Sequence, residues 1–311
     1  MKITVLDGYG LNPGDMSWEW LGNIGEYTVY DRTPAELVYE RTMDSDAVIV
    51  NKIVFDKELL DKLPKLKYIG ITATGYNIVD TEYAYKKGIV VTNVPAYSTD
   101  SVAQHTFTLL LELLNRSTLH DESVKEGKWS RNADFCYWLK PQTEISGKTL
   151  GIIGGGKIGT KVAEIARAFG MKTMMCGSRP MAGRVSLDEL LGASDVISLH
   201  CPMNKDTDKI INKNNISKMR DGVYIINTAR GGLVDESDVS EALKSGKIAG
   251  FAADVLSSEP PAIDNPIITS PNTLITPHVA WATLEARTRL MDKVKENLEC
   301  FVSGNVQNRV I

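Results

Sequence analysis

The sequence of 311 residues predicts an α/β protein made of two domains, each with a parallel β-sheet wrapped by helices. Short apolar runs alternate with helical patterns through the first hundred residues, as is typical of a parallel sheet. A second alternating series begins near Thr149, after an irregular aromatic segment. A glycine loop over residues 154–159 follows the first strand of that series and opens a helix. The length suits two cores better than one.

In the first domain, the apolar runs are spaced as strands separated by helices. Strands are expected at residues 3–6, 27–30, 47–50, 68–71 and 90–92, and helices at 35–42, 57–63 and 80–87. Pro34 fits the first turn of its helix, where a missing N–H costs little. The alternation predicts a parallel sheet wrapped by helices, and we expect this half to be of the flavodoxin-like type.

The second half continues the alternation after one long apolar helix over residues 102–114. Strands are expected at residues 149–153, 172–176, 195–199, 223–227, 250–254 and 273–276, and a last helix at 284–302. This last helix is expected to return to the first domain. The predicted domains are residues 1–99 with 286–311, and a Rossmann-like domain over 100–285.

Aromatic side chains are concentrated in residues 127–147, including Trp129, Phe135 and Trp138. An exposed aromatic excursion often covers a partner subunit, so we expect a dimer arm over about residues 115–147 and a homodimer. The alternative is a loop that packs on its own domain.

Composition and charge exclude several classes of protein. A net charge of −4 with no long basic run does not indicate a basic surface for binding nucleic acid. No stretch approaches the roughly 18 apolar residues of a membrane span, and the start reads as a strand rather than a signal peptide. The four cysteines lack zinc-like spacing, so they are expected to be reduced, with no metal site and a cytoplasmic location.

The glycine loop has the context of a dinucleotide site, because a strand precedes it and a helix opens on it. Gly154 permits the tight turn, Gly156 lets the backbone approach a pyrophosphate, and Gly159 lets helix and strand pack closely. Lys157 and Ile158 open the helix, whose first N–H groups would hold the pyrophosphate. The alternative is a glycine-rich turn with no ligand.

The choice between NADPH and NADH depends on the end of the next strand. An NAD site wants an acidic residue there for the ribose 2′-hydroxyl, but no Asp or Glu occurs from residue 171 to 187. Gly177 carries no charge, and Ser178 and Arg179 are suited to bind a 2′-phosphate. The sequence therefore favours NADPH. The alternative is a solvated Arg179 beside an NAD site.

Three chemistry-bearing residues follow predicted strands of the second half. Arg230 follows the strand at 223–227 and offers a bidentate grip on a carboxylate. His278 follows the strand at 273–276, and Glu259 comes after the strand at 250–254. Ligands of open α/β sheets bind at the carboxyl ends of strands. A carboxylate beside an imidazole stabilises the imidazolium, which can then protonate a carbonyl oxygen.

Two other residues near these strand ends are open to more than one interpretation. Trp281, three residues after His278, would either wall the substrate pocket or simply pack. His200 stands at a strand end and is expected to border the cofactor, without proton chemistry.

The chain resembles the D-2-hydroxyacid dehydrogenase family over nearly its whole length, in particular the glycerate dehydrogenase or hydroxypyruvate/glyoxylate reductase branch. The resemblance rests on Ala73-Thr74-Gly75-Tyr76-Asn77, Val94-Pro95-Ala96-Tyr97-Ser98, the glycine loop, Leu199-His200-Cys201-Pro202, Asn227-Thr228-Ala229-Arg230-Gly231, Asp254-Val255 and Thr276-Pro277-His278.

The resemblance implies an active site of Arg230, Glu259 and His278. It implies that the loop Ala73-Thr74-Gly75 offers backbone N–H groups to the substrate carboxylate, and that Asp254 contacts the nicotinamide carboxamide. Further cofactor contacts are expected from His200, Pro202, Thr207, Thr228, Ala229 and His278, and substrate contacts from Arg230 and Trp281. Gly177 departs from the family, which usually has a ribose-binding Asp there.

The expected reaction is reduction of a small 2-oxo acid, hydroxypyruvate or glyoxylate, to the D-2-hydroxy acid by NAD(P)H. Two alternatives stay open. One is a non-catalytic protein that senses nicotinamide redox state, which would not need Arg230, Glu259 and His278 together. The other is a dehydrogenase for phosphoglycerate or D-lactate. No second cation besides Arg230 is obvious in the pocket loops, which disfavours a phosphorylated substrate, although Lys52 weakens that inference.

Overall fold

The computed structural model describes residues 1–177 and 183–311, and its chain divides into two compact units. Unit 1 comprises Met1–Ser98 and Ala282–Ile311, and unit 2 comprises Thr99–Trp281. The last helix, α10 (Leu284–Val302), therefore belongs with the N-terminal residues and packs against β4 of their sheet. Each unit is an α/β fold with a parallel sheet, which confirms the predicted fold class.

Unit 1 has its strands in the order β2-β1-β3-β4-β5, the flavodoxin-like order. The strands are β1 (Lys2–Val5), β2 (Glu26–Val29), β3 (Ala47–Val50), β4 (Tyr68–Ile71) and β5 (Val90–Thr92). The helical segments of the first 98 residues are η1 (Gly8–Gly10), η2 (Glu19–Asn23), η3 (Ala35–Leu37), α1 (Val38–Thr42), α2 (Lys57–Asp61) and α3 (Thr81–Lys86). Strands β3 and β4 are buried along their whole length, as expected of central strands in a sheet covered on both faces.

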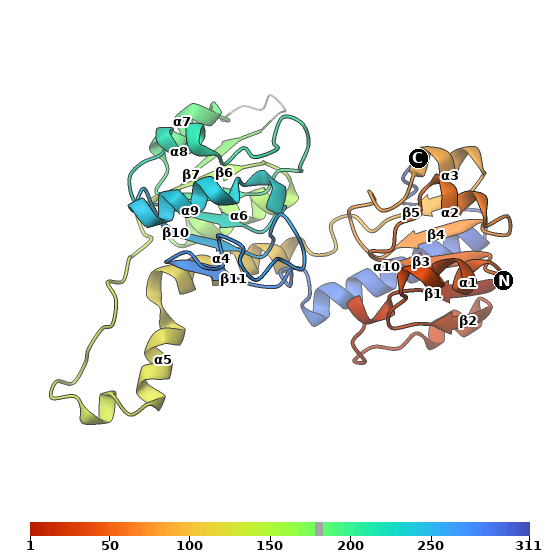
Figure 1. Ribbon diagram of the computed structural model, residues 1–311, viewed down its shortest axis with the longest axis horizontal. Coiled ribbons are helices and arrows are strands. Elements are labelled where there is room, and N and C mark those ends of the chain that lie inside the picture. The colour runs from red at the N-terminus through yellow and green to blue at the C-terminus, as the bar shows by residue number, and fades with distance from the viewer. Residues whose placement is uncertain (178–182) are drawn as a thin grey trace. The chain divides into compact units, whose positions relative to one another are not determined.

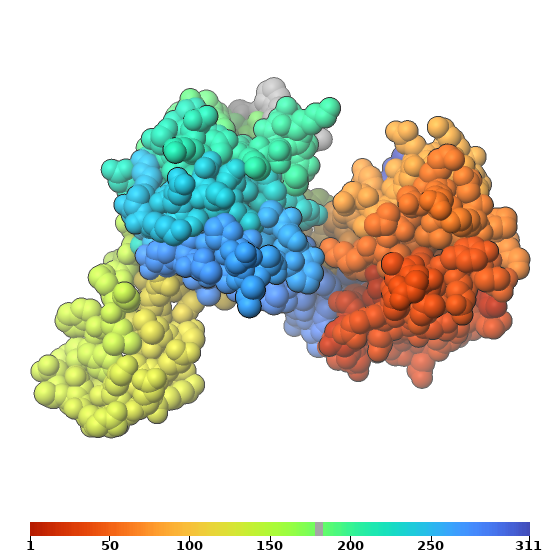
Figure 2. Space-filling view, viewed as in Figure 1, coloured from red at the N-terminus to blue at the C-terminus, as the bar shows by residue number. Residues whose placement is uncertain are grey.

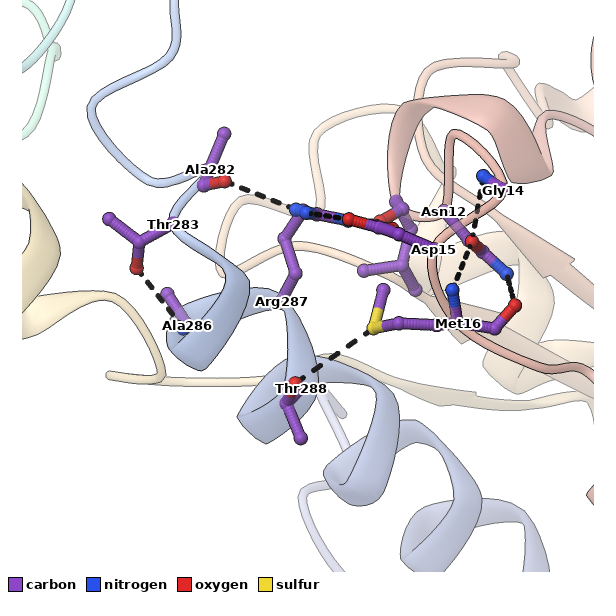
Figure 3. Close-up of polar contacts among 10 residues, drawn as sticks. Asn12, Gly14, Asp15, Met16, Ala282, Thr283, Ala286, Arg287 and Thr288 are labelled. Atoms are coloured by element: carbon purple, nitrogen blue, oxygen red, sulfur yellow. Dashed lines mark hydrogen bonds and ion pairs between the residues drawn. The ribbon is translucent and has the colours of Figure 1, made fainter.

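The start of α10 is held to the loop after η1 by an arginine (Figure 3). Arg287 is only 8% exposed, and its Nη1 and Nη2 donate to the two carboxylate oxygens of Asp15 at 2.7 and 2.5 Å. Its Nε donates to the Ala282 carbonyl and its Nη1 also to Leu11. Thr283 caps the helix by accepting from the Ala286 N–H. One side chain thus joins residues 272 positions apart.

Asp15→Asn should lower Tm at neutral pH because it leaves the buried Arg287 without its carboxylate. The hydrogen bond from Arg287 holds the pKa of Asp15 below its usual value. The stabilisation is therefore present above the ordinary carboxyl pKa and lost as pH falls through the lower folded value. Thermal unfolding across pH should show wild type and variant converging in acid. Asp44→Asn, at an exposed pair with Lys65, is the control with the smaller effect. Equal shifts for both variants would contradict the prediction.

Unit 2 has the strand order β11-β10-β9-β8-β6-β7, all parallel. A short parallel bridge from Met175 to Arg184 extends it beyond β7, which completes the Rossmann order on that side. The strands are β6 (Thr149–Ile153), β7 (Lys172–Cys176), β8 (Val196–Leu199), β9 (Val223–Asn227), β10 (Ile248–Ala253) and β11 (Thr273–Ile275).

Helices cover both faces of this sheet, because successive strand residues enter opposite cores. Ile152 and Ile226 pack with α4 and α6, whereas Ile153 and Ile225 pack with α7, α8 and α9. The bounds are α4 (Thr99–Asn115), α6 (Lys157–Ala168), α7 (Leu187–Ala193), α8 (Lys213–Lys218), η5 (Gly231–Leu233) and α9 (Glu236–Ser245). Among the described residues, no helix combines the length and apolarity needed to cross a membrane.

The predicted arm follows α4 and contains a helix that the sequence pattern did not reveal. It consists of α5 (Ser117–Lys125), η4 (Trp129–Arg131) and a chain that runs on to β6, and it stands out as a yellow-green lobe (Figures 1 and 2). Three of its aromatic side chains lie open to solvent: Phe135 is 89% exposed, Trp138 72% and Trp129 53%. Within this chain, they do not pack on a core of their own.

Candidate active site

The glycine loop turns sharply from β6 into α6, and its three glycines meet different demands. Gly154 has φ +108°, and a Cβ on it would lie 2.5 Å from the His200 carbonyl oxygen. A Cβ on Gly159 would lie 2.1 Å from the Gly154 carbonyl oxygen. Gly156 is the N-cap of α6, and a Cβ there would meet nothing within 4 Å. The space beside Gly156 is therefore open, next to the first free N–H groups of α6, which are the groups that bind phosphate at a helix start.

The segment after β8 lies directly against this loop. Burial lowers the pKa of His200 to about 3, so its imidazole is neutral, and Nε2 lies 2.8 Å from the Ser198 hydroxyl. The Thr207 hydroxyl donates to the Pro202 carbonyl at 2.7 Å and closes the following turn. His200 thus borders the glycine loop, and Pro202 and Thr207 belong to the turn that follows it.

At the end of β7, the structure shows a cation that the sequence reasoning missed. Ser178 and Arg179 lie outside the described residues. The Arg184 guanidinium donates to the Gly155 carbonyl at 3.3 Å, and its Nη1 would lie 3.1 Å from a Cβ on Gly177. A guanidinium therefore lies where an NAD site places its ribose-binding carboxylate. Arg184 lies within residues 171–187, which contain no Asp or Glu. This lack of acidic residues was the sequence signal that could have directed attention to Arg184.

His278 and Glu259 meet as an acid–base pair. Nδ1 of His278 lies 2.6 Å from Oε2 of Glu259, and the two side chains are 30% and 36% exposed. The other carboxylate oxygen accepts from the Leu256 N–H at 3.3 Å. Because Nδ1 faces the carboxylate, proton exchange with a substrate falls to Nε2. The pair can hold an imidazolium and deliver its proton from one defined nitrogen.

A buried carboxylate holds the turn that carries His278. Asp254 is 1% exposed, and its Oδ1 accepts from the Thr276 hydroxyl at 2.6 Å and from the Val279 N–H at 2.8 Å. Its Oδ2 accepts from the Ala280 N–H at 2.8 Å. His278 has φ +55°, in the left-handed region, and its N–H donates to the Asp254 carbonyl at 2.8 Å. Asp254 thus stabilises a backbone shape that a non-glycine residue rarely adopts.

Arg230 lies at the carboxyl end of β9, which pairs with β10; β11 lies on the other side of β10. The Asn227 side chain fixes its turn by donating to the Arg230 carbonyl and accepting from the Ala229 N–H. A Cβ on Gly231 would lie 1.9 Å from the Leu256 carbonyl carbon, so this turn packs on the chain that leads to Glu259. The Arg230 side chain is exposed. All three predicted catalytic residues therefore follow adjacent strands at one edge of the sheet.

The other predicted contacts are distributed between the two units. Thr228 and Ala229 begin the Arg230 turn, and the Thr228 hydroxyl lies 3.0 Å from that of Thr106 on α4. Trp281 is the last residue of unit 2 and is half-buried. The loop Ala73-Thr74-Gly75 follows β4 in unit 1, where the Thr74 hydroxyl donates to the Val94 carbonyl at 2.9 Å.

A Rossmann sheet with a phosphate-binding turn and a His–Glu pair at its carboxyl edge defines a nicotinamide-dependent oxidoreductase. Residues 107–280 match the family described as D-isomer specific 2-hydroxyacid dehydrogenase, NAD binding domain. The chain belongs to this D-2-hydroxyacid dehydrogenase family, as its motifs suggested.

Relatives match most or all of the chain. A protein of Blautia hydrogenotrophica named hydroxypyruvate reductase is 47% identical over 320 residues, covering 100% of this chain and 99% of its own. A glycerate dehydrogenase of Methylorubrum extorquens is 40% identical, covering 92% of each chain. Among solved structures, an acyclic imino acid reductase (Bsp5) in complex with NADPH and D-Arg has a TM-score of 0.87 and 34% identity, covering 100% of both chains. D-Lactate dehydrogenase of Aquifex aeolicus, complexed with NAD and lactic acid, has a TM-score of 0.81 and 33% identity, covering 98% and 96%.

Proposed function

We propose that this protein reduces hydroxypyruvate or glyoxylate to the D-2-hydroxy acid with a reduced nicotinamide cofactor. The contact between His278 Nδ1 and Glu259 Oε2 carries the proposal, because it prepares a proton donor at the sheet edge where a ligand binds. A non-catalytic sensor of nicotinamide redox state would have no use for such a donor. The names of the relatives from Blautia hydrogenotrophica and Methylorubrum extorquens support the substrate class.

The residues of the site divide the work of the reaction. The glycine loop and the start of α6 would hold the cofactor pyrophosphate, through Gly154, Gly156, Lys157, Ile158 and Gly159. A bound nicotinamide supplies the hydride for the substrate carbonyl carbon.

Arg230 would bind the substrate carboxylate and orient the carbonyl oxygen. His278 Nε2 gives its proton to that oxygen as negative charge develops there, and Glu259 stabilises the imidazolium beforehand. Asp254, Thr228 and Ala229 would lie beside the nicotinamide, and Trp281 beside the substrate.

A substrate panel tests this assignment. Oxidation of NADPH and NADH by the purified protein should be followed with hydroxypyruvate, glyoxylate, pyruvate and 3-phosphohydroxypyruvate. The first two should give the highest kcat/KM, and the product should be the D isomer. Highest activity with pyruvate or the phosphorylated acid would move the protein to D-lactate or phosphoglycerate chemistry. No turnover with any of them would favour the sensor.

We infer a preference for NADPH over NADH, supported by the lack of an acid over residues 171–187. Ser178 and Arg179 would bind the 2′-phosphate, together with the Arg184 guanidinium beside Gly177. A charge-assisted hydrogen bond contributes about 1.5–3 kcal/mol, or roughly 10- to 100-fold in affinity. Arg184→Gln should raise the KM for NADPH by about that factor and leave the KM for NADH unchanged. Arg179→Gln, measured beside it, shows which cation dominates. A wild-type preference for NADH would contradict the assignment.

We propose that the arm makes a homodimer. Phe135, Trp138 and Trp129 are exposed in this chain, and burying aromatic side chains of this size stabilises an interface strongly. Sedimentation equilibrium should give twice the chain mass of 34.2 kDa, and Trp138→Ser should shift the equilibrium toward the monomer. A wild-type protein that sediments as a monomer at micromolar concentration would contradict this.

The proposed location is the cytoplasm. The structure has Cys136, Cys176, Cys201 and Cys300 as free thiols, which suits a reducing compartment.

A further inference from the structure

His105 on α4 belongs to none of the sites assigned above, yet its imidazole reaches the strand end that carries His278. Its side chain is 19% exposed, and Nε2 lies 2.9 Å from the Thr276 hydroxyl and 3.5 Å from Oδ1 of Asp254. The two partners lie 171 and 149 positions further along the chain, so the contact joins α4 to the ends of β10 and β11. All of these residues belong to unit 2.

The direction of the hydrogen bonds follows from counting protons. The Thr276 hydroxyl has a single proton, and it lies 2.6 Å from Oδ1 of the Asp254 carboxylate, which only accepts. Because that proton is given to Asp254, the hydroxyl oxygen must accept from His105 Nε2. His105 therefore carries a proton on Nε2, and the chain of bonds runs from His105 through Thr276 to Asp254.

This chain ends on the carboxylate that shapes the catalytic turn. Asp254 accepts the N–H groups of Val279 and Ala280 on one side of His278, while its backbone carbonyl accepts the His278 N–H itself. The backbone of His278 is in the left-handed region, so the turn depends on these bonds to keep its shape. A rotation of the Asp254 carboxylate would move the turn and the imidazole with it.

We propose that His105 is a positioning residue: it fixes the Thr276 hydroxyl and thereby the Asp254 carboxylate, which aligns His278 for proton delivery. The proposal rests on the proposed role of His278 as the acid. His105 does not touch the reacting atoms, so its loss should lower kcat by a larger factor than it raises the KM for NADPH. A misplacement of the acid by a fraction of an ångström to 1 Å is expected to lower kcat by roughly 10- to 100-fold.

Four variants of the protein test the series of hydrogen bonds from His105 through Thr276 to Asp254, which we call the relay. Each variant is characterised by kcat, by the KM values for 2-oxo acid and NADPH, and by Tm. His105→Leu removes the donor and Thr276→Val removes the hydroxyl, and both should lower kcat by about 10- to 100-fold. His105→Gln retains an N–H at the position of Nε2, and Thr276→Ser retains the hydroxyl, so both should stay within a few-fold of wild type. A merely structural role would not predict this rescue.

A double-mutant cycle separates the relay from independent effects. Adding His105→Leu to Thr276→Val should lower kcat little further. Once the Thr276 hydroxyl is removed, His105 can no longer act on Asp254 through it. Fully additive losses, or an unchanged kcat in His105→Leu with an unchanged Tm, would overturn the proposal.

Two further outcomes are distinguishable. If His105→Leu fails to fold, the contrast between Thr276→Val and Thr276→Ser decides the matter: equal kcat values in both overturn the relay. If His278→Gln keeps full turnover, the proposed role of His278 as the acid fails, whatever the His105 variants show. If the wild-type protein reduces no 2-oxo acid, the proposed function itself fails.

Discussion

His278→Gln is expected to lower kcat for 2-oxo acid reduction by about 10²- to 10⁴-fold, the usual contribution of a positioned general acid. Glutamine can donate a hydrogen bond to the carbonyl oxygen but cannot transfer its proton as the alkoxide forms. The dissociation constant for NADPH, measured by fluorescence, should change far less than kcat, because the glycine loop is proposed to hold the cofactor pyrophosphate. The loss should therefore appear chiefly in turnover rather than in cofactor binding.

Glu259→Gln provides the matched comparison for this loss. The amide still reaches His278 Nδ1 across the 2.6 Å contact but carries no charge to stabilise the imidazolium. Its kcat should lie between those of wild type and His278→Gln. A His278→Gln protein with near-normal turnover on every 2-oxo acid tested would show that the proton comes from elsewhere.

Arg230→Gln is expected to lower kcat/KM by roughly 100-fold or more, with a rise in the substrate KM. A guanidinium makes two parallel charge-assisted bonds to a carboxylate, each contributing about 1.5–3 kcal/mol. Arg230→Lys should recover only part of the loss, because an ammonium cannot reproduce the bidentate grip. Both variants should fold normally, since the exposed side chain donates only to the adjacent Ala229 carbonyl among the bonds described.

Arg220→Gln is the control for this substitution. Arg220 precedes β9 at its amino end and forms an ion pair with Asp195 at 2.9 Å, with 53% of its side chain exposed. Ligands bind at the opposite, carboxyl end of the strands, so its kcat/KM should not change. Similar kinetic losses at residues 220 and 230 would indicate a general effect of removing an arginine and contradict the carboxylate-binding role.

Much of the fold could be predicted from local patterns. The strands at Ala47–Val50, Tyr68–Ile71 and Val223–Asn227 are near-continuous apolar runs, because both faces of a parallel sheet are buried. The last helix, Leu284–Val302, was predicted with its observed bounds because its apolar positions recur at helical spacing. The Glu259–His278 pairing was also expected, since adjacent parallel strands deliver their carboxyl ends to one edge.

Contacts between distant side chains could not be predicted in this way. Arg184 reaches the glycine loop 29 positions away, and His105 reaches Thr276 across 171. Spacing carries no signal for such pairs, because they depend on how distant segments of the chain pack together and not on periodicity. Helix α5 was missed for a different reason: its sequence, Ser117–Lys125, is polar and lacks the apolar stripe of a core helix.

Direct transfer of hydride to a 2-oxo acid is the central claim, and isotope tracing tests it most directly. Hydroxypyruvate should be reduced with NADPH that carries deuterium on the transferred position of its nicotinamide, and the product analysed by mass spectrometry and chiral chromatography. We predict D-glycerate with one deuterium on its second carbon, formed by wild type and at a greatly reduced rate by His278→Gln. Glycerate without deuterium, the L isomer, or no product at all would contradict the account.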